Sequence, residues 1–289
     1  MKKRRVYIIL GSIIALFFLL LILRSIGGGS TSIGQKVAVI DIRGIISRSD
    51  ATIKLLHTYR DDQSIKAIVV RIDSPGGSVA PVQEIYSELK KIEKPIVASM
   101  GGSAASGGYY IACAADTIVA NPGTLTGSIG VIMQFTQLKG LYDKVGLGHK
   151  VIKSGDFKDT GSPFRELTEQ EKAVLQATVD DVYNQFVDTI FEARGDLLTR
   201  DEVVALADGR IFSGKQALDS KLLDQLGNLP DAIEIAAKMA DIEGKPKVVR
   251  KEKKTSLFEQ LLGIKQMPLL DEMFSLPGVT FRYQMSLGD

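Results

Sequence analysis

Short apolar runs rich in β-branched residues alternate with stretches of helical periodicity along most of the chain. Val82, Ile85 and Leu89, for example, share one face of a helix expected over Val79–Ile92. Strands and helices that alternate at this density indicate an α/β fold with largely parallel pairing. The strands expected are Lys36–Ile42, Ala67–Ile72, Ile96–Ala98, Thr117–Ala120 and Lys150–Ile152.

The later part of the chain has a mainly helical pattern. Thr168–Glu171 has the form of a capping box and starts a long amphipathic helix that ends near Arg194 and Gly195. The other helices expected are Thr52–Tyr59, Tyr109–Ala115, Gln137–Val145, Thr199–Leu206, Ser213–Asp219 and Pro230–Met239.

The N-terminal end has the pattern of a membrane anchor. Basic residues in Met1–Arg5 precede the uncharged run Val6–Leu23, which reaches the roughly 18 residues that a span needs. The basic cluster places the N-terminus in the cytoplasm. A cleaved secretory signal is the alternative, but Arg24–Gly27 is a poor small-residue cleavage site. We expect an anchor over 1–26, a flexible tether over 27–35, the main folded domain over 36–244, and a basic strand and tail over 245–289.

Composition removes several classes of function. The net charge of +2 on 289 residues gives no electrostatic case for nucleic acid. Cys113 is the single cysteine, so an intrachain disulfide framework and a Cys-rich zinc site are excluded; its apolar surroundings favour a core thiol. The two histidines, His57 and His149, have no metal-ligand neighbour at helical spacing. We therefore expect no metal and no cofactor.

The stretch Ser99–Asp116 is the most informative part of the sequence. It joins an apolar run to a helix through glycines, alanines and serines, a composition typical of a tight strand-to-helix turn. A serine at such a helix start lies beside free amides, which suits a nucleophile whose attack generates an oxyanion. A purely structural turn is equally consistent with this stretch. The residues alone do not choose among Ser99, Ser103 and Ser106.

The sequence excludes some kinds of active site but does not identify the base that a serine nucleophile needs. There is no phosphate-binding G-x-x-x-x-G-K-[ST] pattern and no G-x-S-x-G nucleophile elbow. A Ser-His-Asp triad is weakly supported, because neither histidine has an evident carboxylate partner in the sequence. A lysine base would have to be desolvated to be neutral near pH 7. Lys158, beside Phe157 in a glycine-rich loop, is one candidate among many lysines.

Four motifs follow one another in order along the chain: Asp73–Ser78, Ala104–Tyr110, Thr126–Val131 and Lys153–Asp159. Together they resemble the signal peptide peptidase A family. The resemblance covers roughly Val37–Leu226, and Gly209–Ala217 resembles a further segment near the end of the family's module.

The resemblance implies a Clp-protease/crotonase-like fold of repeated ββα units and a Ser-Lys catalytic dyad. The family's serine falls on Ser106 and its lysine on Lys158, and the serine that holds the lysine in place falls on Ser128. Its oxyanion amides fall on Gly107 and on the turn of Gly76 and Gly77, without distinguishing between these two. The family's longer members carry serine and lysine in different halves, so a chain of this length implies a homo-oligomeric ring with sites completed between subunits.

The expected function is that of a membrane-anchored, single-pass serine endopeptidase with an extracytoplasmic catalytic domain. Its expected substrates are remnant signal peptides and other apolar peptides. The alternatives are a crotonase-type acyl-CoA enzyme and an inactive protease-like scaffold. A further hypothesis is that the tail, including Met285–Asp289, reaches substrate grooves and limits activity.

Overall fold

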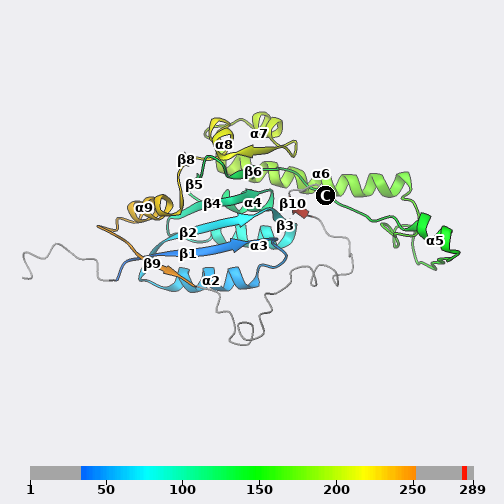
Figure 1. Ribbon diagram of the computed structural model, residues 1–289, viewed down its shortest axis with the longest axis horizontal. Helices are drawn as coiled ribbons and strands as arrows, with labels where there is room; N and C mark the ends of the chain where they lie inside the picture. Colours follow the sequence, from blue (N-terminus) through cyan, green and yellow to red (C-terminus); the bar gives the residue numbers. More distant parts are fainter. Residues whose placement is uncertain (1–33, 252–281, 285–289) are drawn as a thin grey trace, which may run out of the picture.

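The computed structural model describes residues 34–251 and 282–284, which form an α/β structure around one mixed sheet (Figure 1). The sheet has eight strands in the order β7-β6-β4-β2-β1-β9, with β5 beside the first half of β4 and β8 beside β5. Its pairings are parallel except for β6 with β7. The strands are β1 Lys36–Arg43, β2 Ile65–Ser74, β4 Ile96–Ala105, β5 Thr117–Ala120, β6 Leu125–Gly127, β7 Ile211–Ser213, β8 Gln225–Leu226 and β9 Lys247–Arg250, with β3 Gly76–Ser78 and β10 Arg282–Gln284 in a separate pair.

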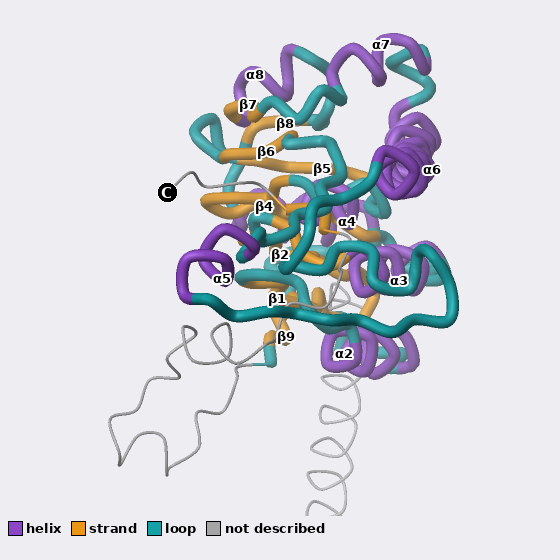
Figure 2. The backbone as a smooth tube through the Cα atoms, turned by 90° about the vertical axis from the view of Figure 1, so that its right-hand side faces the viewer, coloured by secondary structure: helices purple, strands orange, loops and turns teal. Residues whose placement is uncertain are grey.

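Helices cover the two faces of the sheet unequally. Figure 2 shows α2, α3, α4 and α6 along one side of the sheet, while α9 packs on the other face. The C-terminal half of α6 is packed into the core, whereas its N-terminal half extends beyond the sheet (Figure 1). The helices are α2 Asp50–Asp61, α3 Val79–Lys90, α4 Gly107–Ala112, α5 Lys139–Val145, α6 Glu169–Arg194, α7 Arg200–Leu206, α8 Gly214–Asp219 and α9 Leu229–Met239.

Successive side chains of the central strands point alternately into two hydrophobic cores, one on each face of the sheet. Ile68, Val70 and Ile72 of β2 point into the larger core under α2, α3, α4 and α6. Val69, between them, joins the smaller core under α9. Burial of each such side chain contributes about 1.5–3 kcal/mol, so a one-residue slip of the strand would be strongly disfavoured.

The expected strands and helices are confirmed to within a few residues, with two exceptions. The strand expected over Ile96–Ala98 continues to Ala105. The capping box at Thr168–Glu171 is present at the start of α6, and Val82, Ile85 and Leu89 are buried. The second exception is the strand expected over Lys150–Ile152, which is absent from the structure. Ile152 is fully exposed. Among the described residues, no strand pairs with residues 150–152.

The predicted membrane anchor and tether, 1–26 and 27–35, lie almost entirely outside the described residues. Within 34–251 and 282–284, no helix is both long enough and apolar enough to span a bilayer.

Candidate active site

The glycine-rich stretch from Ser99 is mostly strand, which corrects the turn that the sequence predicts. β4 continues to the residue before Ser106, and its second half pairs with both β2 and β6. Small residues permit this close approach: a Cβ on Gly101 would lie 2.8 Å from Cγ of Asp73. Ser99 and Ser103 are therefore strand residues. Of the three serines, Ser106 alone lies where the strand ends and α4 begins.

Ser106 has an unfavourable backbone and an unfavourable side-chain environment. Its φ of 52° and ψ of −116° are rarely adopted by a residue with a side chain, at a cost of about 1–3 kcal/mol. Its amide is fixed by donating to the carbonyl of Gly127 at 2.7 Å. The side chain is buried, yet within the described residues its Oγ has no hydrogen-bond partner. Such a group usually has a role other than stabilising the fold.

Ser128 lies at the same edge of the sheet as Ser106. Ala105 and Gly127 are opposite each other in the β4–β6 register, and the two serines follow them directly. Ser128 also has a positive φ, of 48°, and its amide donates to the carbonyl of Arg210 at 2.8 Å. The structure thus brings together two of the predicted site residues.

The Gly76–Gly77 turn forms β3, a short strand whose position is fixed by Ile46. The amide of Ile46 donates to the carbonyl of Gly76 at 2.9 Å, and Ser78 donates to the carbonyl of Ile46 at 2.8 Å. Because backbone groups alternate in direction along a strand, the N–H and C=O of Gly77 face the opposite side. The amide of Gly76 is already used, since it donates to Oγ of Ser74 at 3.1 Å.

The start of α4 packs against the same turn. Gly107 is the first helical residue and is buried. A Cβ on Gly108 would lie 3.1 Å from the carbonyl oxygen of Ser74, so the helix approaches the Gly76–Gly77 segment closely. The first amides of a helix have no acceptor within it. The free amides that follow Ser106 therefore lie at the end of α4 that packs against this turn.

Replacing Gly77 with alanine is expected to disrupt this turn. The new Cβ would lie 2.1 Å from the carbonyl oxygen of Ile46, a backbone atom that can move only if the chain around it shifts. We expect a loss of about 1–3 kcal/mol in the free energy of unfolding, measured in urea, with a fall in peptide turnover. Gly123→Ala is the matched control, because its Cβ would meet nothing within 4 Å. Equal behaviour of the two variants would contradict this role of Gly77.

The outer edge of β3 pairs with a strand from the C-terminal end of the chain. β10 is antiparallel to β3, with Tyr283 opposite Gly77 and Gln284 opposite Gly76. This edge is therefore able to accept an extended segment. Of the predicted tail, residues 252–281 and 285–289 lie outside the described part of the chain.

Lys158 is not assembled with Ser106 in this chain. It lies in an arm, residues 131–168, which carries α5 and stands beyond the end of the sheet beside the first turns of α6 (Figures 1 and 2). The side chain of Lys158 is exposed, and in residues 34–251 no hydrogen bond joins it to Ser106 or Ser128. Of the predicted site residues, the structure groups Ser106, Ser128, Gly107, Gly76 and Gly77, and leaves Lys158 apart.

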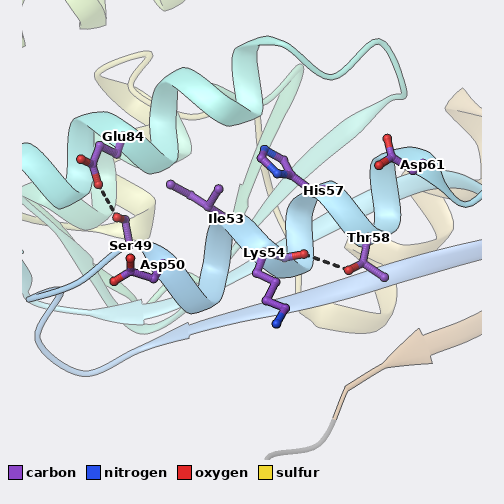
Figure 3. A pocket seen from close by; sticks show the side chains of 8 residues that line it. All are labelled: Ser49, Asp50, Ile53, Lys54, His57, Thr58, Asp61 and Glu84. Atoms are coloured by element: carbon purple, nitrogen blue, oxygen red, sulfur yellow. Dashed lines mark hydrogen bonds between the residues drawn. The ribbon is translucent and has the colours of Figure 1, made fainter.

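The histidines and the cysteine are placed elsewhere. His57 Nε2 contacts Oε2 of Glu88 at 2.6 Å, a partner 31 positions away that sequence spacing could not identify. His57 lines an open groove between α2 and α3 (Figure 3), and that groove contains none of the predicted site residues. His149 stacks on Phe164. Burial raises the pKa of Cys113 to about 12, in agreement with a core thiol. Among the described residues, no group of three His, Cys, Asp or Glu side chains is arranged to hold a metal.

Comparison with known families agrees with this geometry. Residues 35–124 match the Clp protease family, so the sheet and its covering helices are a Clp protease-like α/β fold. The class of the chain is serine protease, as the match to a peptidase family and a relative named as a serine protease show. Residues 88–243 match peptidase family S49, and the chain belongs to that family.

Similar proteins occur in bacteria and in plants. A Synechocystis protein assigned as a protease is 47% identical over 217 residues, which cover 74% of this chain and 77% of that protein. An Enterococcus faecium protein named as a signal peptide peptidase, SppA, is 36% identical over 213 residues, 73% of this chain and 61% of its own. The chloroplastic serine protease SPPA of Arabidopsis thaliana is 34% identical over 255 residues, 82% of this chain and 37% of its own. The resemblance inferred from the four motifs is confirmed.

Proposed function

We propose that this serine protease is an endopeptidase in which Ser106 is the nucleophile and Lys158 the general base. The observation that carries the proposal is the buried, unpartnered hydroxyl of Ser106, held in a strained backbone conformation beside free amides. Ser128, at the same sheet edge, is proposed to hold the lysine amine in place. No cofactor and no metal take part in this proposal.

In the proposed reaction, neutral Lys158 Nζ takes the proton of Ser106 Oγ as the oxygen bonds to the scissile carbonyl carbon. The resulting oxyanion accepts hydrogen bonds from backbone amides. When the C–N bond breaks, the lysine returns its proton to the leaving amine, and an acyl-enzyme remains on Ser106. Water, deprotonated by the same lysine, then attacks the ester. As the bond from Ser106 Oγ to the acyl carbon breaks, the lysine returns this proton to Oγ and the second product is free.

We assign the oxyanion amides to Gly107 and Gly77. Gly107 has no intrahelical acceptor for its N–H because it begins α4. The Gly76 amide donates to Ser74, so in β3 the amide of Gly77 is the one assigned. It lies on the edge that pairs with residues 282–284, which would have to leave that edge before the amide could bind the oxyanion. This choice extends the sequence interpretation, in which the two glycines were not distinguished.

We further propose that Lys158 reaches Ser106 of a second copy of the chain in a homo-oligomeric ring. Two features support this. The lysine is exposed on a projecting arm, whereas the serine hydroxyl is buried. The arm also presents apolar side chains to solvent, and a neighbouring subunit would bury them. These side chains are Leu141, Val145, Leu147, Val151, Ile152 and Phe157.

The proposed substrates are extended apolar peptides, including remnant signal peptides. The edge of β3 accepts an antiparallel strand from residues 282–284, and a substrate would bind there by main-chain hydrogen bonds. The relative named as a signal peptide peptidase supports this substrate class. The proposal includes an uncleaved N-terminal anchor over 1–26 in the cell membrane, with the catalytic domain on the extracytoplasmic side.

Incubating the full chain with a synthetic apolar signal peptide and with an acyl-CoA thioester tests the reaction class. Peptide cleavage without thioester turnover is the result expected. Thioester turnover alone would support the crotonase-type reaction, and turnover of neither would support an inactive scaffold.

Removing residues 252–289 is expected to increase the rate of cleavage of a short apolar peptide. The reason is competition, because β10 pairs with the same β3 edge that the substrate would use. Tyr283→Pro in the full chain is the second variant, since proline has no N–H to donate to β3. Turnover at subsaturating peptide concentration is the measurement. Unchanged turnover in both variants would contradict competition by the tail.

A further inference from the structure

The loop that carries Lys158 is a series of tight turns without regular secondary structure. The amide of Lys158 donates a hydrogen bond to the carbonyl of Gly155 at 3.2 Å, and the amide of Thr160 donates one to the carbonyl of Phe157 at 3.2 Å. Such a loop has little intrinsic rigidity. Its shape must come from contacts between side chains.

Arg165 makes those contacts as a planar fork between two carboxylates. Its Nε lies 2.9 Å from Oδ2 of Asp159, and its Nη2 lies 2.7 Å from Oδ1 of the same residue. On the other side, Nη1 lies 2.8 Å from Oε2 of Glu171. Lys153 Nζ adds a contact of 2.7 Å to Oδ1 of Asp159. The two cations thus balance the two carboxylates.

The side chains of Arg165, Lys153, Asp159 and Glu171 form an ionic cluster. Glu171 connects this cluster to the rigid part of the fold. It is the N3 residue of α6, and its Oε2 accepts from the amide of Thr168 at 2.8 Å in the capping box. Its Oε1 accepts a hydrogen bond from the hydroxyl of Thr160 at 3.0 Å, and Thr160 belongs to the loop that carries Lys158. The loop is therefore fastened to the start of α6, and the other end of that helix is buried in the core.

Geometry and burial distinguish this cluster from an ordinary surface ion pair. The Glu171 side chain is 3% exposed and that of Asp159 is 14% exposed. Bidentate, partly buried pairs are stronger than exposed pairs between flexible side chains. Hydrogen bonds from Arg165 hold the pKa values of both carboxyls far below their usual range, so both are ionised at neutral pH.

The cluster also decides which charge lies next to the lysine. Asp159 is adjacent to Lys158 in sequence, and a carboxylate that paired with the lysine would stabilise its protonated form. Instead, Arg165 and Lys153 occupy both oxygens of Asp159. In the part of the chain described, Lys158 forms no ion pair.

The geometry points to Arg165 as a positioning residue for Lys158: it fixes the lysine loop on α6 and withholds the Asp159 carboxylate from the lysine amine. This inference rests on the proposed function, in which Lys158 is the general base. The sequence shows the capping box that contains Glu171, but it carries no signal that places Glu171 or Arg165 near the candidate site.

The test compares Arg165→Gln with two further variants in the full chain. We expect Arg165→Gln to lower kcat/KM for an apolar peptide by about 10²-fold, because a displaced base loses its alignment with the serine. We also expect the acid limb of its pH–rate profile to move to higher pH, because the released Asp159 carboxylate favours protonated Lys158. Adding Asp159→Asn to Arg165→Gln should return the acid limb towards the wild-type position while the rate stays low. A general loss of folding would not produce a shift that the second substitution reverses.

Asp143→Asn is the matched control. It breaks the exposed Lys139–Asp143 pair on the same arm and is expected to leave both rate and profile unchanged. If Arg165→Gln behaves like this control while Lys158→Ala is inactive, the inference is wrong and the proposed function stands. If Lys158→Ala itself retains activity, the proposed base is wrong and the inference fails with it. An acid limb that the double variant does not restore would also contradict the inference.

Discussion

Ser106→Ala is expected to lower peptide turnover by on the order of 10⁴-fold or more, because the reaction loses its nucleophile. The same change should not lower the free energy of unfolding, since the hydroxyl it removes is buried and has no hydrogen-bond partner in the described residues. Activity and unfolding in urea, measured on the same preparation, give both quantities.

Ser103→Ala is the matched control for this prediction. Ser103 is a residue of β4 in the same glycine-rich stretch, but its hydroxyl donates to the carbonyl of Ser74 at 3.3 Å. Its replacement should leave turnover nearly unchanged. A full loss of activity in the control, or residual activity in Ser106→Ala close to wild type, would contradict the choice of nucleophile.

Lys158→Ala is expected to be as inactive as Ser106→Ala, although it removes only an exposed side chain. Mixing the two inactive proteins under conditions that exchange subunits should restore activity. If each site takes its serine from one copy and its lysine from another, random pairing gives about a quarter of the sites both groups. Turnover after mixing, compared with each variant alone, is the measurement.

No recovery after confirmed subunit exchange would contradict completion of the site between copies. Two further mixtures test the arm directly, since Arg165→Gln should restore activity when mixed with Ser106→Ala but not when mixed with Lys158→Ala. Arg165 would thereby be grouped with the lysine and not with the serine.

The periodic parts of the chain could be predicted because their side chains alone determine which face is buried. Val82, Ile85 and Leu89 indicated the buried face of α3, and Thr168–Glu171 located the start of α6. Both signals are local, since they depend on residues within a few turns of one another. They required no knowledge of the neighbouring elements.

The non-local parts could not be predicted in this way. β3, β6 and β7 are only three residues long, and pairing with strands distant in sequence is what makes them strands. The stretch from Ser99 to Ser103 looks like a turn by composition, yet its small residues serve the close approach of β4 to Asp73. Lys150–Ile152 has the composition of a strand but has no partner in the described part of the arm.

The same distinction between local and non-local signals applies to the candidate site. The four motifs indicated Ser106, Ser128 and Lys158, and the family membership they implied is confirmed, while the roles of these residues stay predictions. The fork of Arg165 on Asp159 and Glu171 has no sequence signal beyond the capping box, because its members meet only when the loop folds back on α6.

The most direct test is to map where a serine-directed acylating probe attaches in the wild-type chain and in Lys158→Ala. After proteolytic digestion, mass spectrometry of the peptide containing Ser106 gives both the position and the extent of labelling. We expect an adduct on Ser106 in the wild type and almost none in Lys158→Ala. An adduct on a different serine, or undiminished labelling of Ser106 without Lys158, would contradict the proposed Ser-Lys mechanism.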